Sequence, residues 1–351
     1  MAKRKAKRSG MKKIEPAVMT LNFTTPIVAP GAVGNSTIDL SQVASLVNRR
    51  FYRQGINWAV SGFKIFSVAG TKAAVTIQKL PNTWVLANSW EKAFRTWTEM
   101  NKKALVDNES VKPRFHDFKI FADQTHHTAG TGANLLPFNI DPTGLQNVAT
   151  AGDWDYSTIH VPDTQNNVGV SDQRVVLEFD MIATGASYPG AGASGNDAVS
   201  LIEGYASSRA LPNVLDPNTP DDARAITGPT PANWLSAIFN EGLIQESEII
   251  RDMQTQNEIA PYPFENDGTN LDTMYPGGAN QLPGLQTHDG AIVSTTTIGG
   301  TTYMKGGNFP CGLIRILHGA DPESISAGLS IQVDLVPGNH RGYMCETMTE
   351  M

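Results

Sequence analysis

The stretch LSIQVDL, residues 329–335, places an apolar side chain at every second position. Side chains alternate between the two faces of a strand, so this period of two predicts a strand with one buried and one solvated face. The same alternation recurs along the whole chain. Similar runs lie at residues 18–23, 58–68, 73–80, 115–121, 154–161, 175–181 and 312–318.

The spacing of these runs indicates how the strands connect. Most of them are separated by far more residues than a hairpin turn needs, which favours a Greek-key sandwich over an up-and-down meander. The 32 glycines and 21 prolines suit a turn-rich β protein. Long loops are expected at residues 124–153, 185–196, 211–231 and 261–290.

One helix is well specified, from Asn88 to Lys103. Asn88 is the expected N-cap, with Glu91 completing a capping box and Lys102 and Lys103 in the last turn. Trp90 and Trp97 share a face of this helix, and we interpret them as core residues rather than a base-stacking platform. Further helical insertions are expected at residues 197–209, 232–239 and 243–256.

The first 13 residues form a cationic arm on an acidic chain. They carry seven of the 27 Lys and Arg residues and none of the 34 Asp and Glu residues. Such a segment cannot bury enough apolar surface to order itself, but it gains affinity by neutralising phosphates. We expect a disordered arm that binds nucleic acid through Lys3, Arg4, Lys5, Lys7, Arg8, Lys12 and Lys13. The same run also resembles a nuclear localisation signal, and the two roles are compatible.

A second basic cluster interleaves cations with aromatic residues. Arg49, Arg50 and Arg53 surround Phe51 and Tyr52. Such a cluster can bind phosphate and stack a base, so the three arginines are also candidate nucleic-acid contacts. It can equally be an exposed helix end with Phe51 buried, and the sequence leaves both alternatives open.

Other motifs argue against an enzyme. Residues 190–195 spell GAGASG, but the intervening chain and Pro189 separate them from the preceding strand, so we interpret them as a flexible glycine loop. The pair His126 and His127 lacks metal-site spacing and is expected in a loop. With Cys311 and Cys345 as its only cysteines, the chain is expected to be intracellular and to have no disulfide framework. No cofactor, metal site or catalytic constellation is expected. A calcium site between subunits stays open as an alternative to solvated turns for the loop aspartates Asp153, Asp155, Asp221, Asp222, Asp267 and Asp272.

The sequence also lacks the features of a membrane or secreted protein. No run approaches the roughly 18 uninterrupted apolar residues of a membrane-spanning helix. The basic N-terminus is not followed by the apolar region of a signal peptide. We therefore expect no membrane insertion.

Three local motifs carry a resemblance to a known family. The motif LPNTW at residues 80–84, the segment from Trp90 to Trp97, and KPRFHDFK at residues 112–119 resemble capsid proteins of small circular Rep-encoding single-stranded DNA viruses of the circo-like, stool-associated type. The resemblance implies a single eight-stranded jelly roll, a two-sheet β-sandwich. It implies a basic arm at residues 1–13 that contacts the genome, and a jelly-roll capsid domain at residues 14–351 with loop and helix insertions. This arm is shorter than the arginine-rich arms typical of circoviruses.

The hypothesis from the sequence is therefore a viral capsid protein. Its partners would be other copies of itself, about 60 in an icosahedral shell, and a packaged single-stranded genome, with DNA or RNA left open. It would be found in the virion and, during assembly, in the host nucleus. The alternative is a cellular nuclear, nucleic-acid-associated β-sandwich protein whose basic leader serves as a localisation signal.

Overall fold

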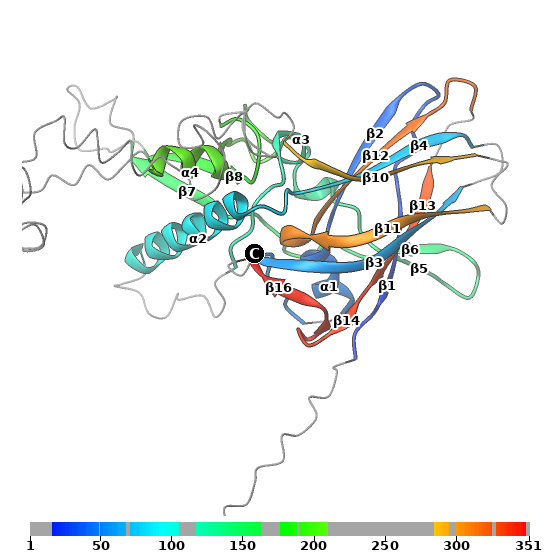
Figure 1. The fold of residues 1–351 in the computed structure, drawn as a ribbon, viewed down its shortest axis with the longest axis horizontal. Helices are drawn as coiled ribbons and strands as arrows, with labels where there is room; N and C mark the ends of the chain where they lie inside the picture. The colour runs from blue at the N-terminus through cyan, green and yellow to red at the C-terminus, as the bar shows by residue number, and fades with distance from the viewer. Residues whose placement is uncertain are drawn as a thin grey trace, which may run out of the picture.

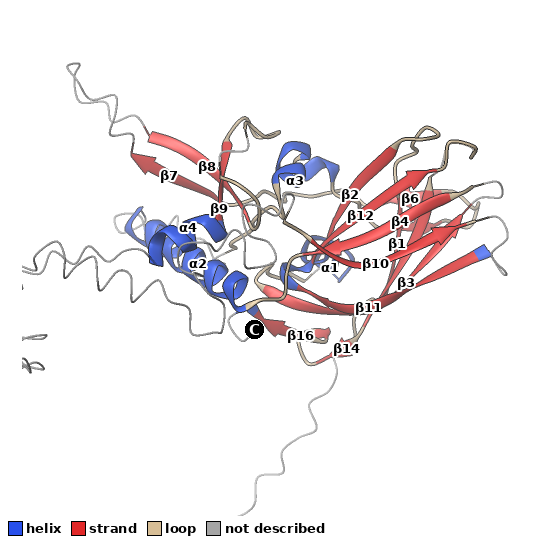
Figure 2. Ribbon diagram, turned by 45° about the horizontal axis from the view of Figure 1, so that its top comes forward, coloured by secondary structure: helices blue, strands red, loops and turns tan. Residues whose placement is uncertain are grey.

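The computed structural model describes nine segments of the chain: residues 16–48, 50–67, 71–104, 117–162, 176–187, 190–209, 284–294, 300–324 and 328–348. Two antiparallel sheets form the main body (Figures 1 and 2). The first contains β1 (Thr20–Thr24), β13 (Leu329–Leu335), β3 (Ile56–Ser67) and β11 (Thr301–Phe309) in that order, and β16 (Cys345–Thr347) also pairs with β3. The second contains β10 (Gln286–Val293), β4 (Ala73–Lys79), β12 (Leu313–Ala320) and β2 (Val33–Asp39).

The sheets share one apolar core, which makes the body an all-β sandwich with helices outside it. In β13, every second side chain is buried, so the alternation in LSIQVDL is confirmed. Phe23, Phe63 and Val333 from the first sheet join Ile77 and Ile316 from the second in a single buried cluster. Burying one face of each sheet against the other removes apolar surface from water, and this provides the main driving force for folding.

The strand pairing follows a regular order along the chain. β1 pairs with β13, β2 with β12, β3 with β11 and β4 with β10, all antiparallel. The pairs β13 with β3 and β12 with β4 then join these four ribbons into the two sheets. Thus, apart from the short β16, the first sandwich strand of the chain pairs with the last, and the two middle strands pair with each other.

Three connections meet at one end of the sandwich. The backbone N–H of Gly31 donates to Ala320 O at 2.9 Å, that of Lys72 to Ser324 Oγ at 2.8 Å, and that of Asp321 to Lys72 O at 3.0 Å. These bonds bring the β1–β2, β3–β4 and β12–β13 connections together, on the right in Figure 1. At the opposite end lie α1 (Leu40–Asn48) and, from the long segment between β4 and β10, the helix α2 (Trp84–Ala104) with strands β7 (Thr158–Pro162), β8 (Val176–Ile182) and β9 (Asp197–Ser200). The hairpin of β5 (Phe138–Ile140) and β6 (Gln146–Val148) from the same segment lies beside β1 instead.

That long segment contributes to a second, smaller core, which it shares with Cys311, Leu313 and Met348. Its strands β7, β8 and β9 form a sheet, with β8 and β9 parallel. Trp90, Phe118, Met181 and Ile202 belong to this second core. The other described elements are α3 (Gln124–Ala129), η2 (Thr131–Ala133), α4 (Leu201–Arg209), η4 (Pro310–Gly312), β14 (Pro337–Gly338) and β15 (Gly342–Tyr343).

The helix predicted from Asn88 to Lys103 is present, but it begins four residues earlier than predicted. α2 begins at Trp84, and Thr83 rather than Asn88 caps it, because Thr83 Oγ1 accepts the backbone N–H of Leu86 at 3.4 Å. Asn88 lies inside the helix and donates through Nδ2 to Tyr205 Oη at 3.4 Å. Trp90 is 6% exposed, which confirms its interpretation as a core residue.

Two further expectations are corrected. The described part of the run 115–121 forms no strand apart from a single bridge between Phe121 and Ile182, because its residues are buried between the sandwich and the insertion rather than on a sheet face. Residues 197–200 form a strand, so the helix expected from 197 begins only at Leu201. The helices expected at 232–239 and 243–256 lie outside the described residues.

Candidate nucleic-acid interface

The structure places two of the ten candidate nucleic-acid contacts. Arg50 and Arg53 lie in the short connection from α1 to β3, and both are solvent-accessible. Arg49 and all seven basic residues of the arm, from Lys3 to Lys13, lie outside the described residues.

The described chain begins beside this connection. The backbone N–H of Val18 donates to Asn48 Oδ1 at 3.0 Å, and Val18 O accepts from Tyr343 Oη at 2.7 Å. Asn48 is the last residue of α1 and donates through Nδ2 to the same Tyr343 oxygen at 2.7 Å. Lys13 precedes Val18 by five residues, so covalent geometry limits the distance between their Cα atoms to about 18 Å. The described chain therefore begins near the end of α1, which Arg50 follows by two residues.

The two aromatic residues of the cluster have different environments. Tyr52 is fully buried and donates through its hydroxyl to Arg341 O at 2.9 Å. It is a core residue and cannot stack a base, which corrects one half of that hypothesis. Phe51 is half-buried, and its ring centroid lies 6.4 Å from that of Trp154.

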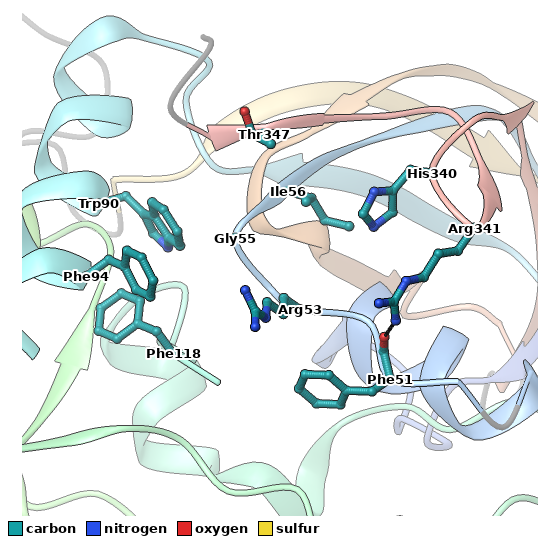
Figure 3. Close-up of a pocket in the computed structure, with 10 residues that line it drawn as sticks. All are labelled: Phe51, Arg53, Gly55, Ile56, Trp90, Phe94, Phe118, His340, Arg341 and Thr347. Carbon is teal, nitrogen blue, oxygen red and sulfur yellow. Dashed lines mark hydrogen bonds between the residues drawn. The ribbon is translucent and has the colours of Figure 1, made fainter. Parts of the chain in front are cut away.

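A pocket of about 430 Å³ lies between the sandwich and α2 (Figure 3). One wall is aromatic. Trp90 and Phe94 stack with centroids 5.2 Å apart and planes inclined by 13°, and Phe118 packs edge-on against Trp90. The pocket is lined by Phe51, Arg53, Gly55, Ile56, Trp90, Phe94, Phe118, His340, Arg341 and Thr347.

The opposite side of the pocket carries basic groups. Figure 3 shows Arg53 between the aromatic wall and the turn that bears His340 and Arg341. Arg341 donates through Nη1 to Phe51 O, which attaches this turn to the α1–β3 connection. Burial, helped by the charge of Arg341, lowers the pKa of His340, so the imidazole is neutral near pH 7. The two arginines therefore supply the positive charge.

A smaller neighbouring pocket of about 290 Å³ contains Arg50. It shares Phe51 with the first pocket and is also lined by Lys119 and Trp154. Lys119 Nζ lies 4.2 Å from the centroid of the Trp154 ring and 2.6 Å from Asp117 Oδ2. Arg50 and Arg53 thus line two adjoining hollows that share Phe51.

The histidine pair is structural and lies in a helix rather than in the expected loop. His126 and His127 belong to α3 and are almost completely buried. His126 Nε2 lies 2.8 Å from Asn134 Oδ1, and burial lowers the pKa of this imidazole to about 3. His127 Nε2 lies 3.1 Å from Asp180 Oδ2.

The glycine motif at 190–195 is also structural. Gly192 packs so closely against His127 that a Cβ there would lie 2.5 Å from its Nε2, and Ser194 Oγ donates to Asp180 at 2.6 Å. Within the described segments, no three His, Cys, Asp or Glu residues cluster as metal ligands. The described helices include none that is long and apolar enough to cross a membrane.

The turn at His340 and Arg341 and most of the aromatic wall were not identified from the sequence as parts of a site. His340 and Arg341 follow Arg53 by almost 290 residues, and the wall comes from α2 and the chain near Phe118. No local pattern links these positions. The available signal was the NHRG segment at 339–342, a polar turn immediately after the last long strand.

Comparisons of the chain with protein-family profiles, with curated proteins and with solved structures find no match.

Proposed function

We propose that this chain is a viral capsid protein whose sandwich is a jelly roll, with a structural rather than a catalytic role. The supporting observation is the pairing order. Numbered along the chain and leaving aside the short β16, the other eight sandwich strands pair first with eighth, second with seventh, third with sixth and fourth with fifth. An antiparallel ribbon folded over itself has this order, and double Greek-key jelly rolls of this kind build viral shells.

The position of the arm supports a role in packaging. The described chain begins at the end of the sandwich that carries α1, where Arg50, Arg53 and Arg341 also lie. The arm and these arginines can therefore face the same nucleic acid, while the connections at the other end of the sandwich remain remote from it. A shell with this end directed inward would concentrate positive charge on its genome.

An exposed hairpin supports contacts between subunits. β5 and β6 pair only with each other among the described strands, and Ile140, Leu145 and Val148 on or next to them are 66%, 67% and 61% exposed. Large apolar side chains gathered on one projecting hairpin are typical of an interaction surface. In the proposed shell, a second copy of the chain would cover them.

Negative-stain electron microscopy of the purified full-length protein tests the proposal. The sample is examined near neutral pH and moderate salt, with and without added single-stranded DNA or RNA. Uniform closed particles under either condition are the expected result, since nucleic acid can recruit many arms to one polymer. A persistent monomer or small oligomer under all conditions would overturn the proposal and favour the cellular nuclear alternative.

A further inference from the structure

We infer that the pocket between α2 and the His340–Arg341 turn binds a nucleotide of single-stranded nucleic acid. The base stacks on the half-buried ring of Phe94, which itself packs against the buried Trp90 and Phe118, and Arg53 and Arg341 hold the adjacent phosphates. This site is separate from the arm, and it binds through base stacking as well as through charge. The inference rests on the proposed function in one respect only: it takes the bound strand to be the packaged genome.

The aromatic wall fits a flat, apolar ligand. Trp90 and Phe94 are nearly parallel, and Phe118 approaches both at centroid distances of 5.7 and 5.8 Å. Phe51 lies across the pocket from them (Figure 3). Every base has an apolar face that can stack on such rings, so the site would accept a strand with little preference for its sequence.

The charge of the lining fits a phosphate. Among the described residues that line the pocket, two are arginines and none carries a carboxylate. Arg53 is exposed and can reach a strand that crosses the mouth of the pocket. A guanidinium presents several donors in one plane, which suits phosphate oxygens.

The backbone at Arg341 is in an uncommon conformation. Its φ is 51°, in the left-handed region that disfavours a residue with a Cβ. In this conformation, its guanidinium bonds to Phe51 O on the rim of the pocket. Glycine would occupy this position with less strain. The presence of arginine therefore indicates that its guanidinium makes an interaction that offsets the strain.

The pocket and the arm can engage the same strand. Tyr343, two residues after Arg341, bonds to Val18 at the start of the described chain. Lys13 precedes Val18 by five residues, so covalent geometry keeps its Cα within about 18 Å of the Val18 Cα. Binding of a base would place the neighbouring phosphates within reach of the arm, and linking the two contacts raises the affinity of the pair above that of either alone.

The test measures binding of fluorescein-labelled oligothymidylate to the full-length protein over a series of salt concentrations. Arg53→Gln and Arg341→Gly each remove one phosphate contact, and glycine also relieves the strained backbone. Each should reduce the log–log salt slope by about 0.7. Phe94→Leu removes stacking, and it should weaken binding by about 5- to 150-fold with an unchanged slope.

Arg95→Gln is the matched control. Arg95 lies on α2 next to Phe94, but it is 76% exposed, pairs with Glu91 and does not line the pocket. Its variant should bind as the unmodified protein does. Identical affinities and slopes for Arg53→Gln, Arg341→Gly and Arg95→Gln would overturn the inference.

Photo-crosslinking of the unmodified protein gives a second reading that needs no variant. An oligonucleotide containing 5-iodouracil should crosslink to the half-buried rings of the pocket, Phe94 of the wall or Phe51 opposite it, whereas the arm contains no aromatic residue. Closed particles without crosslinks at these rings would reject this site and leave the proposed function intact. Crosslinks at these rings in a protein that never assembles would support this site and overturn the proposed capsid function.

Discussion

The guanidinium of Arg315, in the middle of β12, forms a two-pronged ion pair with the carboxylate of Asp123. Arg315 Nη1 lies 3.1 Å from Asp123 Oδ2, and Nη2 bonds to Oδ1. Both side chains are buried, at 2% and 0% exposure. Asp123 also caps α3 by accepting the backbone N–H of His126 at 3.0 Å. One carboxylate therefore connects the sandwich to the insertion between β4 and β10.

Removing one partner of this pair should destabilise the protein strongly. Asp123→Asn leaves the Arg315 guanidinium buried without its counter-charge, which typically costs about 3–5 kcal/mol. The free energy of unfolding, measured with denaturant, checks this. Asp334→Asn is the control, because its partner Lys64 at 2.8 Å is 35% exposed and such pairs contribute about 0–1 kcal/mol. Equal losses in the two variants would contradict the connecting role of Asp123.

Acid should destabilise the fold through His126. Its pKa is about 3 in the folded protein against 6.5 as the ordinary value, so the unfolded chain binds the proton first. Stability should therefore fall as the pH is lowered from about 6.5 towards 3. Asp39 has the opposite effect, because burial raises its pKa to about 6. The folded protein holds the Asp39 proton more tightly than the unfolded chain, so this group stabilises the fold below about pH 3.8, and that stabilisation is lost as the pH rises to 6.

His126→Gln isolates the histidine contribution, since Asp39 is unchanged in the variant. Unfolding free energies of the two proteins at intervals from pH 7 to pH 4 should converge as the pH falls. The unmodified protein loses stability as the pH falls because His126 must be protonated on unfolding, whereas the variant has no titratable group at this position. Parallel curves over this range would show that His126 is not the buried neutral group described above.

Adding a methyl group at Gly55 should disturb the aromatic wall. A Cβ at Gly55 would lie 2.2 and 2.3 Å from the Trp90 ring, which is itself packed in the core. Gly55→Ala should cost about 1–3 kcal/mol by overpacking and shift the tryptophan fluorescence. Gly132→Ala is the control, because a Cβ there meets nothing within 4 Å. A fully stable Gly55→Ala variant would indicate that Trp90 moves freely.

Deleting residues 1–13 should separate electrostatic binding from folding. The segment contributes seven cations and no large apolar side chains other than two methionines. The truncated protein should keep its thermal stability and lose most binding to single-stranded nucleic acid at low salt. The seven cations of the arm should contribute up to about −5 to the log–log salt slope of the full-length protein, and the truncation should remove this contribution. Loss of folding after truncation, or binding that ignores salt, would contradict this role.

Strands that alternate cleanly were predictable from the sequence, and the others were not. β4 and β13 present an apolar residue at every second position to the core. β2 reads VGNSTID, and β11 reads TTYMKGGNF with two adjacent glycines. In β2, Ser36, Thr37 and Asp39 are buried, so polar residues occupy positions where a pattern search requires apolar ones.

The candidate site was predictable only in its local part. The Arg50–Arg53 cluster was visible as a run of basic and aromatic residues. Its role depended on distant partners: Tyr52 is buried by Trp58 and Tyr343, and the pocket beside Arg53 closes only when α2 and the Arg341 turn pack near it. Contacts across such separations arise from the topology of the sandwich, which single-sequence patterns do not encode.

The mass of the native assembly tests the central claim most directly. Sedimentation velocity of the purified full-length protein, with and without single-stranded nucleic acid, gives this mass in solution. With a chain of 37.8 kDa and about 60 copies in the simplest icosahedral shell, the protein component should be roughly 2.3 MDa. A single sharp boundary at that mass, or at a multiple allowed by icosahedral symmetry, is the expected result. A boundary at one or a few chains under both conditions would contradict the account.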